Sequence, residues 1–135
     1  MLIIREKYLQ ELSKWKDKHV IKVLTGIRRS GKSTILNQYK NLLIEKNISE
    51  KQIKLYDFNN PKLLKLTYEE VYDLILENSI PKKTNYIFLD EIQDIKEFEK
   101  CIIGLFENKE YVFDIYLTGS NSHMFSEELA TLFTG

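Results

Sequence analysis

The sequence predicts an α/β fold in which a mostly parallel β-sheet is covered by helices on both faces. Short apolar segments rich in β-branched and aromatic residues alternate along the chain with segments of helical periodicity. Each apolar segment runs into Gly, Asn, Asp or Thr-Gly, as strands that enter loops do. The length of 135 residues, with 43% hydrophobic and 30% charged residues, suits one compact domain.

Four strands and four helices are expected. The strand segments are Val20–Thr25, Ile53–Phe58, Tyr86–Leu89 and Tyr111–Leu117. The helical segments are an amphipathic lead-in helix over Arg5–Lys16, then Ser33–Asn47, Tyr68–Asn78 and Phe98–Phe106. The helix from Tyr68 has the clearest start, because Thr67 and Glu70 match the spacing of a capping box. Asn59, Asn60 and Pro61 are expected to form a turn after the second strand.

Composition excludes several classes of protein. The longest apolar stretch, Cys101–Phe106, is far shorter than the roughly 18 residues that a membrane span needs. Met1–Ile4 has neither a basic leader nor a cleavage site, so a cytoplasmic location without membrane contact is expected. The single cysteine, Cys101, excludes an internal disulfide framework, and its place on an apolar helix face indicates a buried residue rather than a nucleophile.

The charge sums to zero but is uneven along the chain. Residues 1–54 carry 13 Lys and Arg against 5 Asp and Glu, whereas residues 55–135 carry 7 against 15. A basic half is typical of a nucleic-acid surface. We favour a local interpretation, in which a phosphate-binding loop attracts positive charge and a Mg²⁺-binding strand attracts carboxylates.

The strongest motif is Gly26–Ser33, which matches the P-loop spacing G-x-x-x-x-G-K-[ST] at every fixed position. Glycines let the backbone approach phosphate oxygens closely, and the helix that follows directs its positive end at them. Lys32 would supply charge to the terminal phosphates of ATP, and the Ser33 hydroxyl would bind Mg²⁺. The residues expected to contact the nucleotide are Gly26, Ile27, Arg28, Arg29, Ser30, Gly31, Lys32, Ser33 and Thr34.

A second motif, Tyr86–Glu91, is an apolar strand that ends in two acids. Asp90 is expected to hold Mg²⁺ and Glu91 to polarise the attacking water, which would distinguish an ATP hydrolase from other phosphate binders. A third, weaker signal is the run of small polar residues that follows Leu117. Asn121 is the first candidate there for a side chain that reaches the γ-phosphate or the water. Thr118 and Ser120 are the alternatives, and a plain turn is the other interpretation.

The chain resembles the AAA-type ATPase domain of prokaryotic ATP-binding proteins in three motifs, taken in order: G-I-R-R-S-G-K-S-T, L-D-E-I-Q and T-G-S-N-S. The resemblance covers essentially the whole chain. It implies a three-layer P-loop NTPase core whose fourth strand lies between the first and the third. It also implies a Walker A motif at Gly26–Thr34, a Walker B motif at Asp90 and Glu91, and a sensor at Asn121 or Ser120. Residues 1–135 would form the N-terminal part of such a domain, with the lid and a C-terminal domain absent.

Activity is expected to be weak in these residues and complete only in a longer protein. Arg5, Arg28 and Arg29 are the arginines of the chain, so nothing after the P-loop can act as an arginine finger. Such a finger accelerates phosphoryl transfer by about 10³ to 10⁵. The resemblance also implies a further strand beside Val20–Thr25, and its absence would leave an open edge that favours self-association.

Three alternatives belong to other classes. A GTPase is disfavoured, because Gln93 stands three residues after Asp90 where a glycine is expected. A helicase-like ATPase shares the pattern Asp90–Asp94, but the short separation of Lys32 from Asp90 favours the compact AAA arrangement. A nucleotide-sensing or nucleic-acid-binding switch would have no need for the Glu91 carboxylate, although the absent arginine finger is in its favour.

Overall fold

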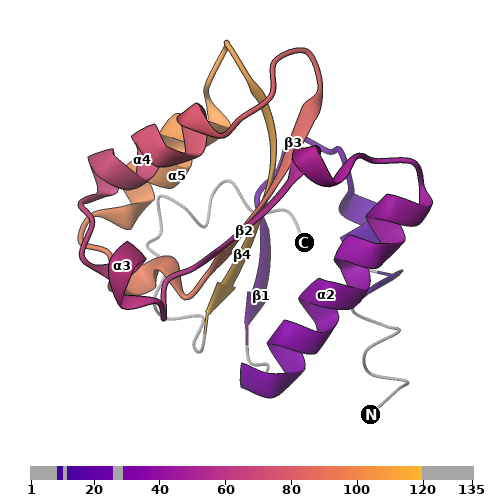
Figure 1. Ribbon diagram of the computed structural model, residues 1–135, viewed down its shortest axis with the longest axis horizontal. Helices are drawn as coiled ribbons and strands as arrows, with labels where there is room; N and C mark the ends of the chain where they lie inside the picture. The colour runs from indigo at the N-terminus through magenta and orange to yellow at the C-terminus, as the bar shows by residue number, and fades with distance from the viewer. Residues whose placement is uncertain (1–8, 11, 26–28, 120–135) are drawn as a thin grey trace.

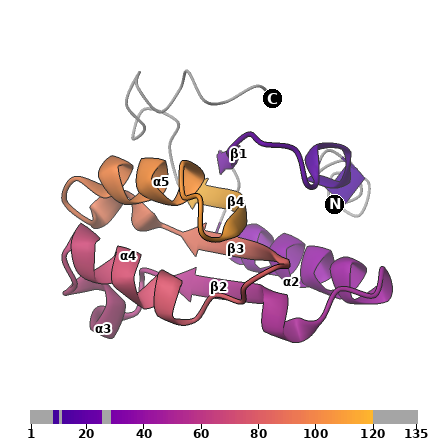
Figure 2. The same ribbon diagram turned by 90° about the horizontal axis from the view of Figure 1, so that it is seen from above.

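The structure is a computed structural model that describes residues 9–10, 12–25 and 29–119, with residues 24–25 and 29–33 described by their backbone alone. Its centre is a four-stranded parallel sheet in the order β1-β4-β3-β2 (Figure 1 and Figure 2). The strands are β1 (Lys22–Thr25), β2 (Ile53–Asp57), β3 (Thr84–Asp90) and β4 (Val112–Gly119). The predicted α/β fold, with the fourth strand between the first and the third, is confirmed.

Helices cover both faces of the sheet (Figure 1). One face carries α2 (Arg29–Glu45), and the other carries α4 (Tyr68–Glu77) and α5 (Phe98–Phe106). The shorter elements are the α-helix α3 (Pro61–Leu64) and the 3₁₀-helices η1 (Glu50–Gln52) and η2 (Ile92–Asp94). Residues 9–10 and 12–15 are helical, where the lead-in helix is predicted. None of the helices in the described part of the chain has the length and apolar character to cross a membrane.

The buried core consists of two clusters, because successive side chains of a strand point to opposite faces of the sheet. On the α2 face, the rings of Phe88 and Tyr116 stack 4.8 Å apart, and Tyr39 of α2 packs against both. On the other face, Ile87 and Leu89 of β3 pack among buried residues of α4 and α5. Both faces of β3 and β4 are therefore largely buried, which explains why these strands appear in the sequence as nearly continuous apolar runs.

Local signals determine where α4 begins and how closely it packs. The predicted capping box is present: Thr67 Oγ1 accepts a hydrogen bond from the Glu70 N–H at 3.2 Å, and the Glu70 carboxylate accepts one from the Thr67 N–H at 2.9 Å. Gly104 of α5 allows the two helices to approach, since a Cβ at this position would lie 3.0 Å from a ring carbon of Tyr72.

Two local details differ from the sequence predictions. The turn expected at Asn59, Asn60 and Pro61 is confirmed over residues 58–60, but Pro61 is already the first residue of α3, and Asn60 Oδ1 accepts a hydrogen bond from the Lys62 N–H at 3.0 Å. Residues that favour turns also cap helices, so the sequence pattern fits both. In addition, α2 begins at Arg29 rather than at Ser33. A single glycine inside a helix costs only about 1 kcal/mol, which a helix of this length tolerates.

A buried ion pair, which sequence analysis did not predict, joins β1 to β4. Lys22 Nζ contacts Asp114 Oδ1, and the two side chains are 5% and 2% exposed. Asp114 Oδ2 also accepts hydrogen bonds from the Asp17 N–H at 2.9 Å and from the Tyr116 hydroxyl at 2.8 Å. The Tyr116 and Tyr39 hydroxyls lie 2.9 Å apart, which extends the network to α2. Because buried charges are costly unless they are paired, these bonds fix the start of β1 against β4 and α2.

The buried position predicted for Cys101 is confirmed. Cys101 is buried, and burial raises the pKa of its thiol to about 12, which makes it unreactive at neutral pH. His19 is exposed, and its ring stacks on Phe106 with the centroids 4.0 Å apart. His123 lies outside the described residues.

The Lys22–Asp114 pair is expected to be strongly coupled. Lys22→Met or Asp114→Asn should each lower the free energy of unfolding by about 3 kcal/mol, because each change leaves a buried charge or polar group without its partner. The double variant should lose clearly less than the sum of the two single losses. Urea unfolding of the four proteins measures this coupling. Lys100→Ala is the control, since its ion pair with Glu97 is exposed and should leave the unfolding midpoint almost unchanged. Strict additivity of the two losses would contradict the assignment.

Candidate functional site

The parallel register places the ends of β1 and β3 at the same edge of the sheet. Thr25 of β1 is paired with Gly119 of β4, and Asp90 of β3 is paired with Thr118, the preceding residue. Because neighbouring strands lie about 4.8 Å apart, the ends of β1 and β3 are separated by about 10 Å across β4. The end of β1, which leads into the P-loop motif, and the acids at the end of β3 therefore share the carboxyl edge, where open α/β sheets bind ligands.

The helix α2 begins at this same edge (Figure 1). Residues 26–28, which connect Thr25 to Arg29, are too few to carry the start of α2 more than about 14 Å from the end of β1. The first four amides of a helix have no acceptor within it and form its positive end, which is the part of a helix that attracts anions.

The predicted phosphate-binding residues lie in this connection and in the first turns of α2. Gly26, Ile27 and Arg28 lie outside the described residues. The backbone of Arg29, Ser30, Gly31, Lys32 and Ser33 is helical, and their side chains are outside the description. Thr34 follows in the same helix with a half-buried side chain. The contacts of these residues with a nucleotide therefore stay a prediction.

Asp90 is the last residue of β3 and is 8% exposed. It lies two residues after Phe88, so its side chain points to the α2 face of the sheet. Its Oδ1 accepts a hydrogen bond from the Thr118 hydroxyl, and its main-chain carbonyl accepts one from the Phe58 N–H at 2.9 Å. The carboxylate is thus oriented at the edge where α2 begins.

This arrangement fits a Mg²⁺ ion. Mg²⁺ is usually held by one or two protein oxygens together with phosphate and water oxygens, rather than by a cage of protein ligands. The described part of the chain contains no group of three or more His, Cys, Asp and Glu side chains that could hold an ion. A site built from the Asp90 carboxylate, the Ser33 hydroxyl and the phosphates of a nucleotide needs no such group.

Glu91 follows directly and leaves the strand through an unusual backbone conformation. Its φ and ψ angles are 62° and 41°, in the left-handed region that side chains other than glycine rarely adopt. The Glu91 N–H donates to the Thr118 carbonyl at 3.1 Å, and the side chain is nearly buried. The Gln93 amide lies 3.4 Å from Glu91 Oε1, a long contact. The turn at Glu91 therefore ends β3 and starts η2.

Of the three sensor candidates, Thr118 is described, and Ser120 and Asn121 lie outside the described residues. Thr118 is completely buried and bonds to both predicted acids, to Asp90 through its hydroxyl and to Glu91 through its carbonyl. Contact with the nucleotide was the role predicted for Thr118 as an alternative to Asn121, and its contact with Asp90 was not predicted. The pairing of β3 with β4 brings the two residues together, and no sequence pattern signals that register.

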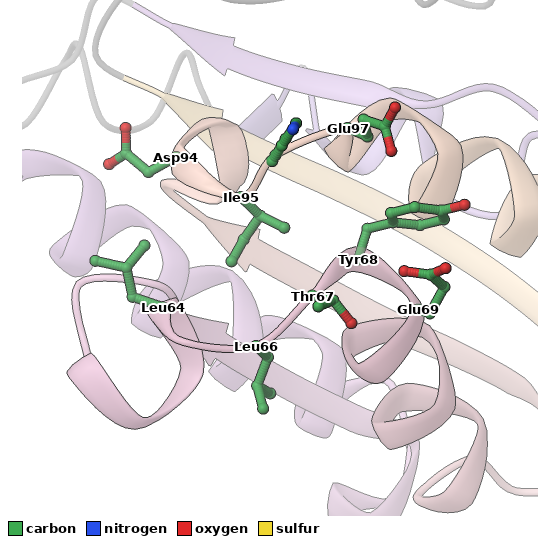
Figure 3. A pocket seen from close by; sticks show the side chains of 9 residues that line it. Leu64, Leu66, Thr67, Tyr68, Glu69, Asp94, Ile95 and Glu97 are labelled. Atoms are coloured by element: carbon green, nitrogen blue, oxygen red, sulfur yellow. The ribbon is translucent and has the colours of Figure 1, made fainter.

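A pocket of about 410 Å³ lies apart from this site, between the start of α4 and the segment from η2 to α5 (Figure 3). Leu66, Tyr68 and Ile95 contribute its apolar lining, and Asp94 and Glu97 contribute carboxylates. It opens on the face of the sheet that carries α4 and α5, whereas the Asp90 carboxylate points to the α2 face. The pocket is therefore distinct from the predicted phosphate site.

The chain is similar to two curated proteins, both described as uncharacterized. It is 35% identical to a protein from Haemophilus influenzae over 136 residues, which cover 99% of this chain and 34% of that protein. It is 32% identical to the protein MJ1544 from Methanocaldococcus jannaschii over 115 residues, which cover 85% of this chain and 24% of that protein. The chain thus spans about a third and about a quarter of the length of these relatives.

A comparison with protein families gives a match over most of the chain. Residues 18–135 match a family described as AAA domain. This range contains the P-loop motif, all four strands and both acids at the end of β3. The chain therefore belongs to the AAA domain family, whose core is of the P-loop ATPase type.

Proposed function

We propose that this domain binds ATP with Mg²⁺ and that the longer protein to which it belongs hydrolyses the bound ATP. The observation that carries the proposal is the shared sheet edge: the P-loop motif connects β1 to α2, and Asp90 and Glu91 end β3 across a single intervening strand. If β3 ran antiparallel to β1, the two acids would lie at the opposite edge of the sheet, a full strand length away from the P-loop motif.

Each residue of the site has a proposed role. The amides at the start of α2 and the Lys32 ammonium bind the phosphates, and Ser33 and Asp90 hold Mg²⁺. The metal supplies charge that stabilises the transferring phosphoryl group. The Glu91 carboxylate accepts a hydrogen bond from the attacking water and takes its proton as the water oxygen bonds to the γ-phosphorus. The bond from that phosphorus to the bridging oxygen breaks in the same displacement, and ADP leaves with the bridging oxygen. Asn121 is the proposed contact to the γ-phosphate.

The proposed turnover of residues 1–135 alone is slow. No arginine follows Arg29 in the sequence, so the charge that an arginine finger would place on the transition state has to come from another chain or from a further part of the same protein. Binding does not depend on that charge in the same way. We therefore expect residues 1–135 to bind Mg²⁺-ATP even though they hydrolyse it slowly.

Two substitutions separate binding from hydrolysis. Lys32→Ala should weaken the binding of Mg²⁺-ATP at least tenfold, since it removes the charge opposite the terminal phosphates. Glu91→Gln should leave that affinity within about threefold and abolish phosphate release, because an amide cannot take the proton. Titration with a fluorescent ATP analogue and a phosphate-release assay measure both effects. Lys40→Ala, on α2 beyond its first turns, is the control. Full activity of Glu91→Gln would disprove the role of the carboxylate.

The backbone of Glu91 makes a separate prediction. A non-glycine residue in the left-handed region costs about 1–2 kcal/mol, and glycine avoids this cost at a loss of about 0.5–1 kcal/mol in chain entropy. Glu91→Gly should therefore be more stable than Glu91→Ala by about 0.5–1 kcal/mol, although both lack the carboxylate. Urea unfolding of the two variants measures the difference. A more stable alanine variant would rule out the left-handed backbone at this residue.

A further inference from the structure

We propose that Thr118 is a positioning residue that orients the Asp90 carboxylate for Mg²⁺ and thereby sets the affinity of the site for the metal. The inference rests on the proposed function, since it concerns the same metal site. It assigns to Thr118 a contact with a protein side chain, in place of the contact with the nucleotide that sequence analysis considers for it.

Different neighbours hold the main chain and the side chain of Asp90. β2 lies on one side of β3, where the Phe58 N–H donates to the Asp90 carbonyl at 2.9 Å. β4 lies on the other side, where Thr118 stands directly opposite Asp90 in the register and its hydroxyl donates to Asp90 Oδ1. Phe58, directly after β2, therefore holds the backbone of Asp90, and the Thr118 hydroxyl holds the orientation of its carboxylate.

The hydroxyl suits a metal ligand because it is neutral. It donates one hydrogen bond to the carboxylate without cancelling its negative charge, which Mg²⁺ requires. The other end of β4 offers a direct comparison, because Asp114 lies on the same face four residues earlier and is paired with the Lys22 ammonium. The Lys22 ammonium neutralises the Asp114 carboxylate, and this pair stabilises the fold. The Thr118 hydroxyl orients the Asp90 carboxylate without bringing a charge of its own.

Thr118 also bonds to the second acid, but through its main chain. The Glu91 N–H donates to the Thr118 carbonyl at 3.1 Å. A substitution of the Thr118 side chain therefore removes the bond to Asp90 and keeps the bond to Glu91. This separation makes the inference specific: loss of the hydroxyl should impair metal binding and leave the function of Glu91 intact.

The test compares Thr118→Val, which keeps the shape of the side chain without its donor, with Thr118→Ser, which keeps the donor. The Mg²⁺ affinity of the complex with a fluorescent ATP analogue should fall about 10- to 100-fold in Thr118→Val, the usual effect of removing a group that orients a metal ligand. Thr118→Ser should stay within about threefold of the wild type. Affinity for the analogue in the presence of EDTA should be the same in all proteins, which a general loss of structure would not allow.

Tyr116→Phe is the matched control. It also removes a buried hydroxyl of β4 that donates to a carboxylate, but at Asp114, away from the carboxyl edge of the sheet. It should lower the urea midpoint and leave the Mg²⁺ affinity unchanged. If Thr118→Val does not fold, Thr118→Ala compared with Thr118→Ser replaces it.

The outcomes distinguish the inference from the proposed function. Equal Mg²⁺ affinity of Thr118→Val and the wild type would overturn the inference and leave the proposed function standing. An equal loss in Tyr116→Phe would also overturn it, since the effect would then be a general one. Absence of Mg²⁺-dependent nucleotide binding in the wild type would overturn both. A loss confined to the Thr118 variants without a hydroxyl would support the inference.

Discussion

The position of β4 between β1 and β3 is the constraint on which the rest of the structure depends. It pairs the end of β1 with Gly119 and the end of β3 with Thr118, and so brings two motifs that are far apart in the sequence to one edge of the sheet. It also buries most of β4 on both faces, so most of its side chains are apolar and its polar side chains have specific hydrogen-bond partners. Asp114 and Thr118 are polar side chains of this kind, near opposite ends of β4.

These two residues lie on the same face of the sheet and meet carboxylate chemistry of different kinds: Asp114 is itself a paired carboxylate, and Thr118 donates to the carboxylate of Asp90. At Asp114 the carboxylate meets an ammonium, a backbone N–H and a tyrosine hydroxyl, so its charge is neutralised and its oxygens are satisfied. Burial raises the pKa of Asp114, and the contact with Lys22 opposes that rise. At Asp90 the residue opposite on β4 contributes a neutral hydroxyl. The first arrangement stabilises the fold, and we propose that the second orients a carboxylate for a cation.

Much of the fold could be predicted because its signals are local. The capping box at Thr67, the helix over Phe98–Phe106 and the apolar strands each follow from residues within a few positions of one another. Resemblance to a known family supplied the strand order, which no local pattern contains. The features that were not predicted have a common cause. The turn residues Asn60 and Pro61 also start the helix α3, and the partner of Lys22 lies 92 residues away along the chain. Both outcomes are decided by tertiary contacts.

Some features of the candidate site could likewise be predicted from the sequence, and others could not. The P-loop spacing and the paired acids could be read from the sequence, because the chemistry of phosphate and Mg²⁺ dictates the residue types. The left-handed backbone of Glu91 could not, since glutamate has no preference for it. That conformation persists because its surroundings fix it: the Glu91 N–H is held by Thr118, and the next residue, Ile92, is completely buried in the core. The conformation ends β3 directly after Asp90 and starts η2. A continued strand would send the side chains of Asp90 and Glu91 to opposite faces of the sheet. We therefore propose that the left-handed backbone at Glu91 allows two adjacent acids to serve one site.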